Sequence, residues 1–188
     1  NLGKLESGDK IGFSAITWST NVMPIIQLGF IPVPIDCNPA TLNVMSKNLL
    51  ERLDKTDLRA FFVTNALGFA GDLGAIREIC NEKGIILIED NCEALGTTLI
   101  DGKTGSFGVM ASFSFFVAHH MSTIEGGMVC TNDDELSERI GDQYIKNSPK
   151  RTILIDGTKE LLDYLSGKYK MLHKQHSAKG WRHSFSWI

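Results

Sequence analysis

Three acidic residues follow a strongly apolar segment in the middle of the chain. Residues 85–88 are all aliphatic, and Glu89, Asp90 and Glu93 come directly after them. A carboxylate at the end of a buried strand loses part of its hydration, which is unfavourable unless it meets a cation or a protonated ring nitrogen. The pattern therefore predicts a site for a cationic ligand group, with helix capping or a solvated turn as the alternative.

Two adjacent histidines follow a second apolar segment. His119 and His120 come after residues 112–118, and Gly126 and Gly127 lie shortly downstream. Imidazole titrates near neutral pH, which suits general acid–base chemistry, whereas hydrogen-bonded structural histidines are the alternative. Adjacent histidines point in different directions and the cysteines lack zinc-site spacing, so we expect no metal site.

The elements that must position these residues alternate along the chain. We expect strands over residues 10–16, 30–35, 58–63, 85–88, 109–115 and 128–131. We expect helices from Ser19 as the N-cap to Gly29, over residues 44–53 and 73–83, and from residue 133 onward. This order predicts an α/β fold, a three-layer sandwich with a mainly parallel sheet. In such sheets ligands bind beyond the carboxyl ends of the strands, where the acidic residues and the histidines fall.

Charge divides the chain of 188 residues into two parts. Residues 1–142 carry a net charge of −9 and residues 143–188 a net charge of +6, which together give −3. We therefore predict a folded domain over residues 1–142 and a basic helical tail over residues 143–188 whose role is unassigned. The tail interleaves cations with aromatic residues, as nucleic-acid contacts do, but a basic helix packing on the acidic domain is the preferred interpretation. We expect no nucleic-acid partner.

Composition and cysteine usage are typical of a cytoplasmic globular protein. Hydrophobic residues make up 43% of the chain and charged residues 22%, which excludes disorder. The apolar segments are too short to span a membrane, and no secretory signal precedes them, so we expect no membrane partner and a cytoplasmic location. The four cysteines have no paired spacing, and we expect reduced, mostly buried thiols.

Several segments in consistent order resemble the DegT/DnrJ/EryC1/StrS family of sugar aminotransferases, which are vitamin B6 enzymes of fold type I. These segments, between Gly8 and Arg139, include GDKI, IEDNCEALG, TGSFG, SFSFF and EGGMVCTND. Most members carry, at the position of His119, a lysine that binds pyridoxal 5'-phosphate covalently. The histidine is similar to that of the nucleotide-sugar 3-dehydrases, which bind pyridoxamine 5'-phosphate without a covalent link. The resemblance thus implies dehydration, a 3-deoxygenation, of a nucleotide-linked 4-keto-6-deoxysugar in deoxysugar and polysaccharide biosynthesis.

The resemblance also implies a role for each matching residue. Asp90 would pair with the ring nitrogen of the cofactor, and Glu93 would lie near the ring hydroxyl. Ser114 would bind the phosphate, Trp18 would stack on the ring, and His119 would move the proton. Without the family, Trp18 could instead be a core residue at a helix start, and Ser114 a strand serine facing the core with a backbone partner.

Members of the family have more chain than this sequence shows. They carry an upstream Gly-Ser/Thr loop that binds the cofactor phosphate and a downstream small domain that closes over the site. We therefore expect the chain to be truncated at both ends, as the core of such an enzyme, and to form a homodimer. The alternative is a catalytically inactive relative that serves as a binding or assembly module.

Overall fold

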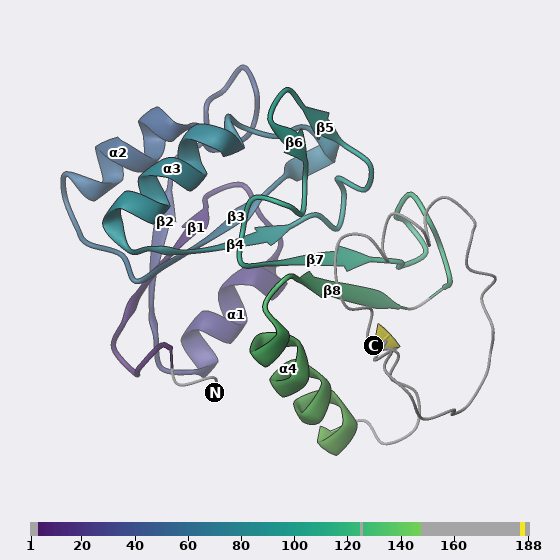
Figure 1. Ribbon diagram of the computed structural model, residues 1–188. Helices are drawn as coiled ribbons and strands as arrows, with labels where there is room; N and C mark the ends of the chain where they lie inside the picture. Colours follow the sequence, from purple (N-terminus) through teal and green to yellow (C-terminus); the bar gives the residue numbers. More distant parts are fainter. Residues whose placement is uncertain (1–3, 125, 148–184, 187–188) are drawn as a thin grey trace. The chain divides into compact units, whose positions relative to one another are not determined.

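The computed structural model describes residues 4–124, 126–147 and 185–186 (Figure 1). The chain divides into two compact units, residues 1–113 and residues 114–188, and each is described by itself. Among the described residues no helix is long and apolar enough to cross a membrane. In the same residues no three His, Cys, Asp or Glu side chains gather in a way that could hold a metal ion.

A parallel sheet forms the centre of the first unit. Its strands are β1 (Lys10–Ser14), β2 (Ile31–Ile35), β3 (Ala60–Thr64), β4 (Ile86–Asp90) and β7 (Met110–Ser114), in the order β2-β1-β3-β4-β7. Its α-helices are α1 (Ser19–Gln27), α2 (Ser46–Leu53) and α3 (Leu73–Lys83). Helices α2 and α3 cover one face of the sheet and α1 lies on the other (Figure 1). The predicted three-layer α/β sandwich with a parallel sheet is therefore confirmed.

The two faces of this sheet are not covered equally. Under α2 and α3 the side chains of Leu49, Phe61 and Ile76 are completely buried. On the α1 side a smaller cluster joins Ile25 of α1 to Ile11 and Ala60. Further along that face the apolar side chains at 86, 88 and 110 are only half-buried. Residues 85–88 are therefore buried on the α2–α3 face and only partly buried on the other.

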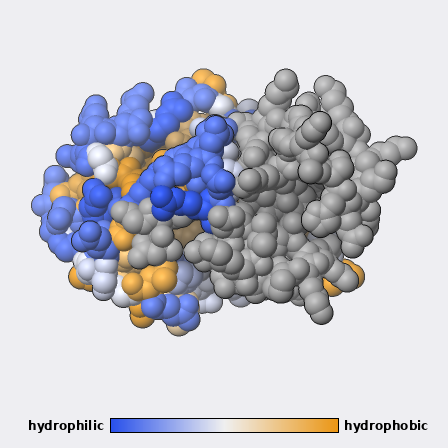
Figure 2. Space-filling model, turned by 60° about the horizontal axis from the view of Figure 1, so that its bottom comes forward, coloured by the Kyte–Doolittle hydropathy of each residue, from blue (hydrophilic) through white to orange (hydrophobic). Residues whose placement is uncertain are grey.

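Helix α1 also brings apolar side chains to the surface. The exposed residues at its outer face and just after it are Met23, Ile26, Leu28 and Ile31. Figure 2 shows the molecule turned so that the side of α1 comes forward, with apolar areas among hydrophilic ones.

The structure contains every helix and strand predicted from the sequence up to residue 133, but some of their ends differ from the prediction. Helix α1 begins at Ser19, but its N-cap is Trp18, without a side-chain cap hydrogen bond, so the predicted cap is wrong. Helix α3 ends at Gly84, which has the left-handed conformation (φ +65°) that favours glycine. A 3₁₀ turn (Ala66–Gly68) and a hairpin of β5 (Thr98–Leu99) with β6 (Gly102–Lys103) were not predicted, because such short pieces show no periodicity.

The second unit contains β8 (Gly127–Thr131), α4 (Asp134–Asn147) and β9 (Phe185–Ser186). Strands β8 and β9 are antiparallel. Asp133 caps α4, since its Oδ1 accepts the N–H of Leu136 at 2.9 Å, and Leu136 is buried, as is Met128 of β8. Helix α4 runs past residue 142, and most of the predicted basic tail, 148–184, lies outside the described residues. The proposed boundary at 142 and the helical tail therefore stay predictions.

Glu89 of β4 holds a loop to the sheet. Its side chain is completely buried, and Oε2 accepts the N–H of Gly105 at 2.7 Å. Its Oε1 accepts the N–H groups of Phe107 and Gly108, each at 2.8 Å. Three main-chain donors thus converge on one carboxylate, which satisfies a charge that burial would otherwise make unfavourable.

We predict that Glu89→Gln lowers the free energy of unfolding by about 2 kcal/mol, because either orientation of the new amide turns its NH₂ group toward a main-chain N–H. Urea unfolding measures the change. Glu82→Gln, on the exposed surface of α3, is the matched control and should change the midpoint little. Equal midpoints for the two variants would contradict the structural role of Glu89.

Candidate functional site

Asp90 lies at the carboxyl end of β4, between Thr64 of β3 and Ser112 of β7 in the strand register. Asp90 is 6% exposed. Oδ2 accepts a hydrogen bond from Nδ2 of Asn21 at 2.5 Å, and Oδ1 accepts the N–H of Cys92 at 3.0 Å. The Ser112 hydroxyl is 3.5 Å from Oδ1, at the outer limit of a hydrogen bond. The carboxylate is therefore held at both oxygens, at the edge where α/β sheets bind ligands.

Asn21 connects Asp90 to two further strand ends. Its buried amide nitrogen lies 2.8 Å from Oγ1 of Thr17 and 3.1 Å from Oγ1 of Thr64, and these two hydroxyls are 2.7 Å apart. The sequence analysis missed Asn21. The available signal was a polar residue four positions before Ile25, on the helix face that is otherwise buried.

Trp18 is exposed just after β1. It is 73% exposed, so the alternative of a core residue at the helix start is wrong. Three more apolar residues, Ile16, Leu67 and Phe69, are exposed in the segments that follow β1 and β3. Because β1 and β3 are neighbouring parallel strands, their carboxyl ends present apolar side chains at the same edge of the sheet as Asp90.

Glu93 has a local partner. Its exposed side chain accepts the N–H of Leu67 through Oε2 at 2.8 Å. Leu67 has a left-handed backbone (φ +57°), which is uncommon for a residue other than glycine. Glu93 therefore fastens the 3₁₀ turn after β3, and its predicted place near a ring hydroxyl stays a prediction.

Ser114 and His119 belong to the second unit. Oγ of Ser114 accepts the N–H of Phe116 at 3.2 Å, so this half-buried serine does have the backbone partner considered as an alternative. The ring of His119 is half-buried and meets the ring of Phe116 edge to face, with centroids 5.9 Å apart. Its Nδ1 is buried and has no hydrogen-bond partner among the described residues. His120, by contrast, is exposed.

The five predicted site residues thus fall into two groups. Trp18 and Glu93 lie on segments that follow strands of the first unit, and Asp90 is the last residue of β4. Ser114, the last residue of β7, and His119 fall in the second unit. The approach of His119 to Asp90 stays a prediction.

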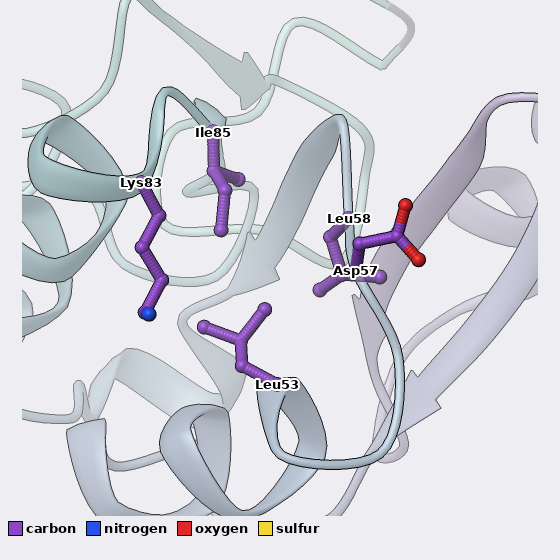
Figure 3. Close-up of a pocket in the computed structure, with 5 residues that line it drawn as sticks. All are labelled: Leu53, Asp57, Leu58, Lys83 and Ile85. Carbon is purple, nitrogen blue, oxygen red and sulfur yellow. The ribbon is translucent and has the colours of Figure 1, made fainter.

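One pocket lies at the other edge of the sheet, before the strands begin (Figure 3). It has a volume of about 180 Å³ and is lined by Leu53, Asp57, Leu58, Lys83 and Ile85. Asp57 forms an ion pair with Lys10 at 2.9 Å. The pocket is smaller than most ligand sites and contains none of the residues described above, so it is no candidate for the same site.

The first unit is a three-layer α/β domain, and its polar and exposed aromatic residues lie at the carboxyl edge of the parallel sheet, where domains of this class bind ligands. The model of the DegT/DnrJ/EryC1/StrS aminotransferase family matches residues 2–156. The chain therefore belongs to the DegT/DnrJ/EryC1/StrS aminotransferase family.

Two curated relatives illustrate the similarity. GDP-4-keto-6-deoxy-D-mannose 3-dehydratase of Escherichia coli O55:H7 is 37% identical over 133 residues, which are 71% of this chain and 34% of the relative. GDP-perosamine synthase of Vibrio cholerae is 32% identical over 135 residues, which are 72% of this chain and 36% of the relative. The chain thus spans about a third of the length of the curated relatives it matches.

Solved structures agree with these relatives. A crystal structure of a GDP-4-keto-6-deoxymannose-3-dehydratase variant with bound GDP-perosamine has a TM-score of 0.69 and 35% identity, covering 79% of this chain and 39% of that one. The E. coli GDP-4-keto-6-deoxy-D-mannose-3-dehydratase with bound hydrated PLP has the same TM-score of 0.69, identity of 35% and coverage of 79% and 39%.

The expectation of free, mostly buried thiols is confirmed. Cys37, Cys80 and Cys130 are buried and Cys92 is half-buried, and all four are free. Burial raises the pKa of Cys80 and of Cys130 from 9.0 to about 12. Burial also raises the pKa of Cys92, and the charge of Asp90 beside it adds to the shift. Since the thiolate is the reactive form, these cysteines are poor nucleophiles in the folded chain.

We predict that a disulfide reagent labels the folded chain slowly at about pH 8, and all four thiols quickly after unfolding in urea.

A thiol whose pKa is raised by folding stabilises the fold below its unfolded pKa, and this stabilisation is lost as the pH rises toward the folded value. The urea midpoint should therefore fall above about pH 9, and Cys80→Ala should make this fall shallower. Equal labelling rates for the folded and the unfolded chain would contradict the prediction of slow labelling.

Proposed function

We propose that this chain is the core of a pyridoxamine 5'-phosphate-dependent enzyme that removes the 3-hydroxyl of a nucleotide-linked 4-keto-6-deoxyhexose. Membership in the family and the similarity to relatives named as GDP-sugar and dTDP-sugar 3-dehydratases support this reaction class. Most family members carry a cofactor-binding lysine at the position of His119. Since histidine cannot form that covalent link, its presence supports a cofactor that is bound non-covalently.

The observation that carries the proposal is the state of Asp90. A carboxylate offers about four acceptor positions, and the N–H groups of Asn21 and Cys92 fill two of them at short distance. If the Ser112 hydroxyl at 3.5 Å takes one of the remaining two, one acceptor position is left for a further donor, such as the protonated nitrogen of a pyridine ring. Trp18 leaves its indole exposed after the neighbouring strand, where it could cover a ring face. The residues present therefore fit the cofactor.

Each of the other residues has a role that its own contacts allow. Ser114 accepts a main-chain N–H, and among the described residues its hydroxyl hydrogen has no acceptor, so it can be donated to a phosphate oxygen. We expect Asp90 to keep the ring nitrogen protonated and Trp18 to hold the ring by stacking. When bound, the protonated cofactor withdraws electrons from the reacting carbon of the sugar.

His119 would carry the proton. Its unpartnered Nδ1 has hydrogen-bonding capacity that the described residues do not use, and its ring rests against Phe116. We expect the imidazole to accept a proton from the methylene carbon of the cofactor and to donate it to the departing 3-hydroxyl oxygen. In the homodimer that the family resemblance implies, a second subunit would contribute some of the phosphate contacts of each site.

We predict that pyridoxamine 5'-phosphate binds the chain saturably and that Asp90→Asn and Ser114→Ala each weaken binding about 10- to 100-fold, because each removes a hydrogen bond to a charged group. Absorbance of the cofactor during titration measures this. Asp54→Asn, on the exposed end of α2, is the matched control. If the unmodified chain leaves the cofactor spectrum unchanged at high concentration, the enzyme proposal fails and the binding-module alternative remains.

A second prediction concerns the position of the usual lysine. His119→Lys should allow borohydride to fix pyridoxal 5'-phosphate to residue 119, because a primary amine then stands beside the bound aldehyde. Mass spectrometry of the peptide carrying residue 119 detects the adduct. The same substitution at the exposed neighbour, His120→Lys, should give little adduct. Equal labelling of both variants would argue against a cofactor site at His119.

A further inference from the structure

Asn21 touches both residues proposed to contact the cofactor ring. Its main-chain N–H donates to the carbonyl oxygen of Trp18 at 3.0 Å. Its side-chain amide donates to Oδ2 of Asp90 at 2.5 Å. One residue in the first turn of α1 therefore joins the segment after β1 to the end of β4, although Asn21 and Asp90 are 69 positions apart.

The orientation of the Asn21 amide is fixed by its surroundings. The residue is 6% exposed, and the hydroxyls of Thr17 and Thr64 lie within hydrogen-bond distance of the same nitrogen. An amide nitrogen has two hydrogens, so one serves Asp90 and the two threonine hydroxyls share the other. A buried network with its donors in use holds a single side-chain arrangement.

This arrangement has a consequence for Asp90. Because Asn21 occupies one acceptor position of Oδ2 and Cys92 one of Oδ1, the direction in which the carboxylate can accept another donor is set. Because Asn21 also holds the Trp18 carbonyl, the start of α1 is fixed with respect to the same carboxylate. One residue thus contacts both, Asp90 through its side-chain amide and Trp18 through its main-chain N–H.

We propose that Asn21 is a positioning residue, which fixes Trp18 and Asp90 relative to each other so that one aromatic cofactor ring fits between the indole and the carboxylate. This inference rests on the proposed function, because the ring is that of the B6 cofactor. Asn21 itself touches no reacting atom. Loss of its side chain releases the start of α1, which carries Trp18, from Asp90 and should disturb both ring contacts, although the main-chain bond to Trp18 remains.

The first experiment compares cofactor binding among variants of the whole chain. Asn21→Ala should weaken pyridoxamine 5'-phosphate binding at least about 10-fold and should change the circular dichroism of the bound ring, because the ring is held less rigidly. Asn81→Ala makes the same chemical change on the exposed surface of α3 and should do neither. Wild-type affinity and an unchanged spectrum for Asn21→Ala would overturn the inference and leave the proposed function standing.

An isosteric variant separates positioning from packing. Asn21→Asp keeps the shape of the side chain but replaces the donated N–H by a carboxylate, which when ionised cannot donate to Asp90 and repels it. It should therefore weaken pyridoxamine 5'-phosphate binding at about pH 8, although no packing volume is lost. Wild-type affinity for Asn21→Asp would contradict the contact.

The last experiment needs no cofactor. If Asn21 holds Asp90, the urea midpoints of Asn21→Ala, Asp90→Ala and the double variant should be non-additive, because the second substitution removes a contact that is already lost. Additive effects would overturn the inference. Failure of the wild-type chain to bind pyridoxamine 5'-phosphate would instead overturn the proposed function and with it the positioning role, even if the midpoints were non-additive.

Discussion

Two neighbouring carboxylates at the end of β4 must both be satisfied without full hydration, and much of the first unit is arranged around this requirement. Successive residues of a strand point to opposite faces of the sheet. Glu89 follows Leu87 on the α2–α3 side and takes three main-chain N–H groups from residues 105–108. Asp90 is on the other side, where α1 supplies Asn21. All the contacts of the Glu89 carboxylate thus stabilise the fold, whereas the Asp90 carboxylate can still accept a hydrogen bond from a ligand.

The same requirement explains why α1 begins where it does. A helix whose first turn buries an asparagine over the sheet edge must start next to that edge, and Trp18 becomes its N-cap without a capping side chain. The usual preference for a serine cap is overridden, since Ser19 is already inside the helix. The indole of this N-cap residue is exposed, so its burial contributes little to fixing the start of the helix.

The sequence was sufficient for the order of strands and helices, because uninterrupted apolar segments such as residues 85–88 and glycine stops such as Gly84 are local signals. It also placed Asp90 at the end of a buried strand, as the structure has it, whereas the roles of Asp90 and His119 in a site stay predictions. It could not distinguish the roles of Glu89 and Asp90, since the donors to Glu89 lie 16 to 19 positions away. Asn21 was missed for the same reason, because its partner is brought to it only by the crossover of the chain.

The contacts of Glu89 also bear on how the chain can vary in length. Gly105, Phe107 and Gly108 aim their N–H groups at one carboxylate, so an inserted or deleted residue between them would turn at least one donor away from it. The β5–β6 hairpin just before them makes no such hydrogen bond to Glu89 at its tip, where Ile100 is fully exposed. Natural insertions in this stretch should therefore collect at residues 99–102, while the spacing from Gly105 to β7 stays constant among sequences that keep the glutamate.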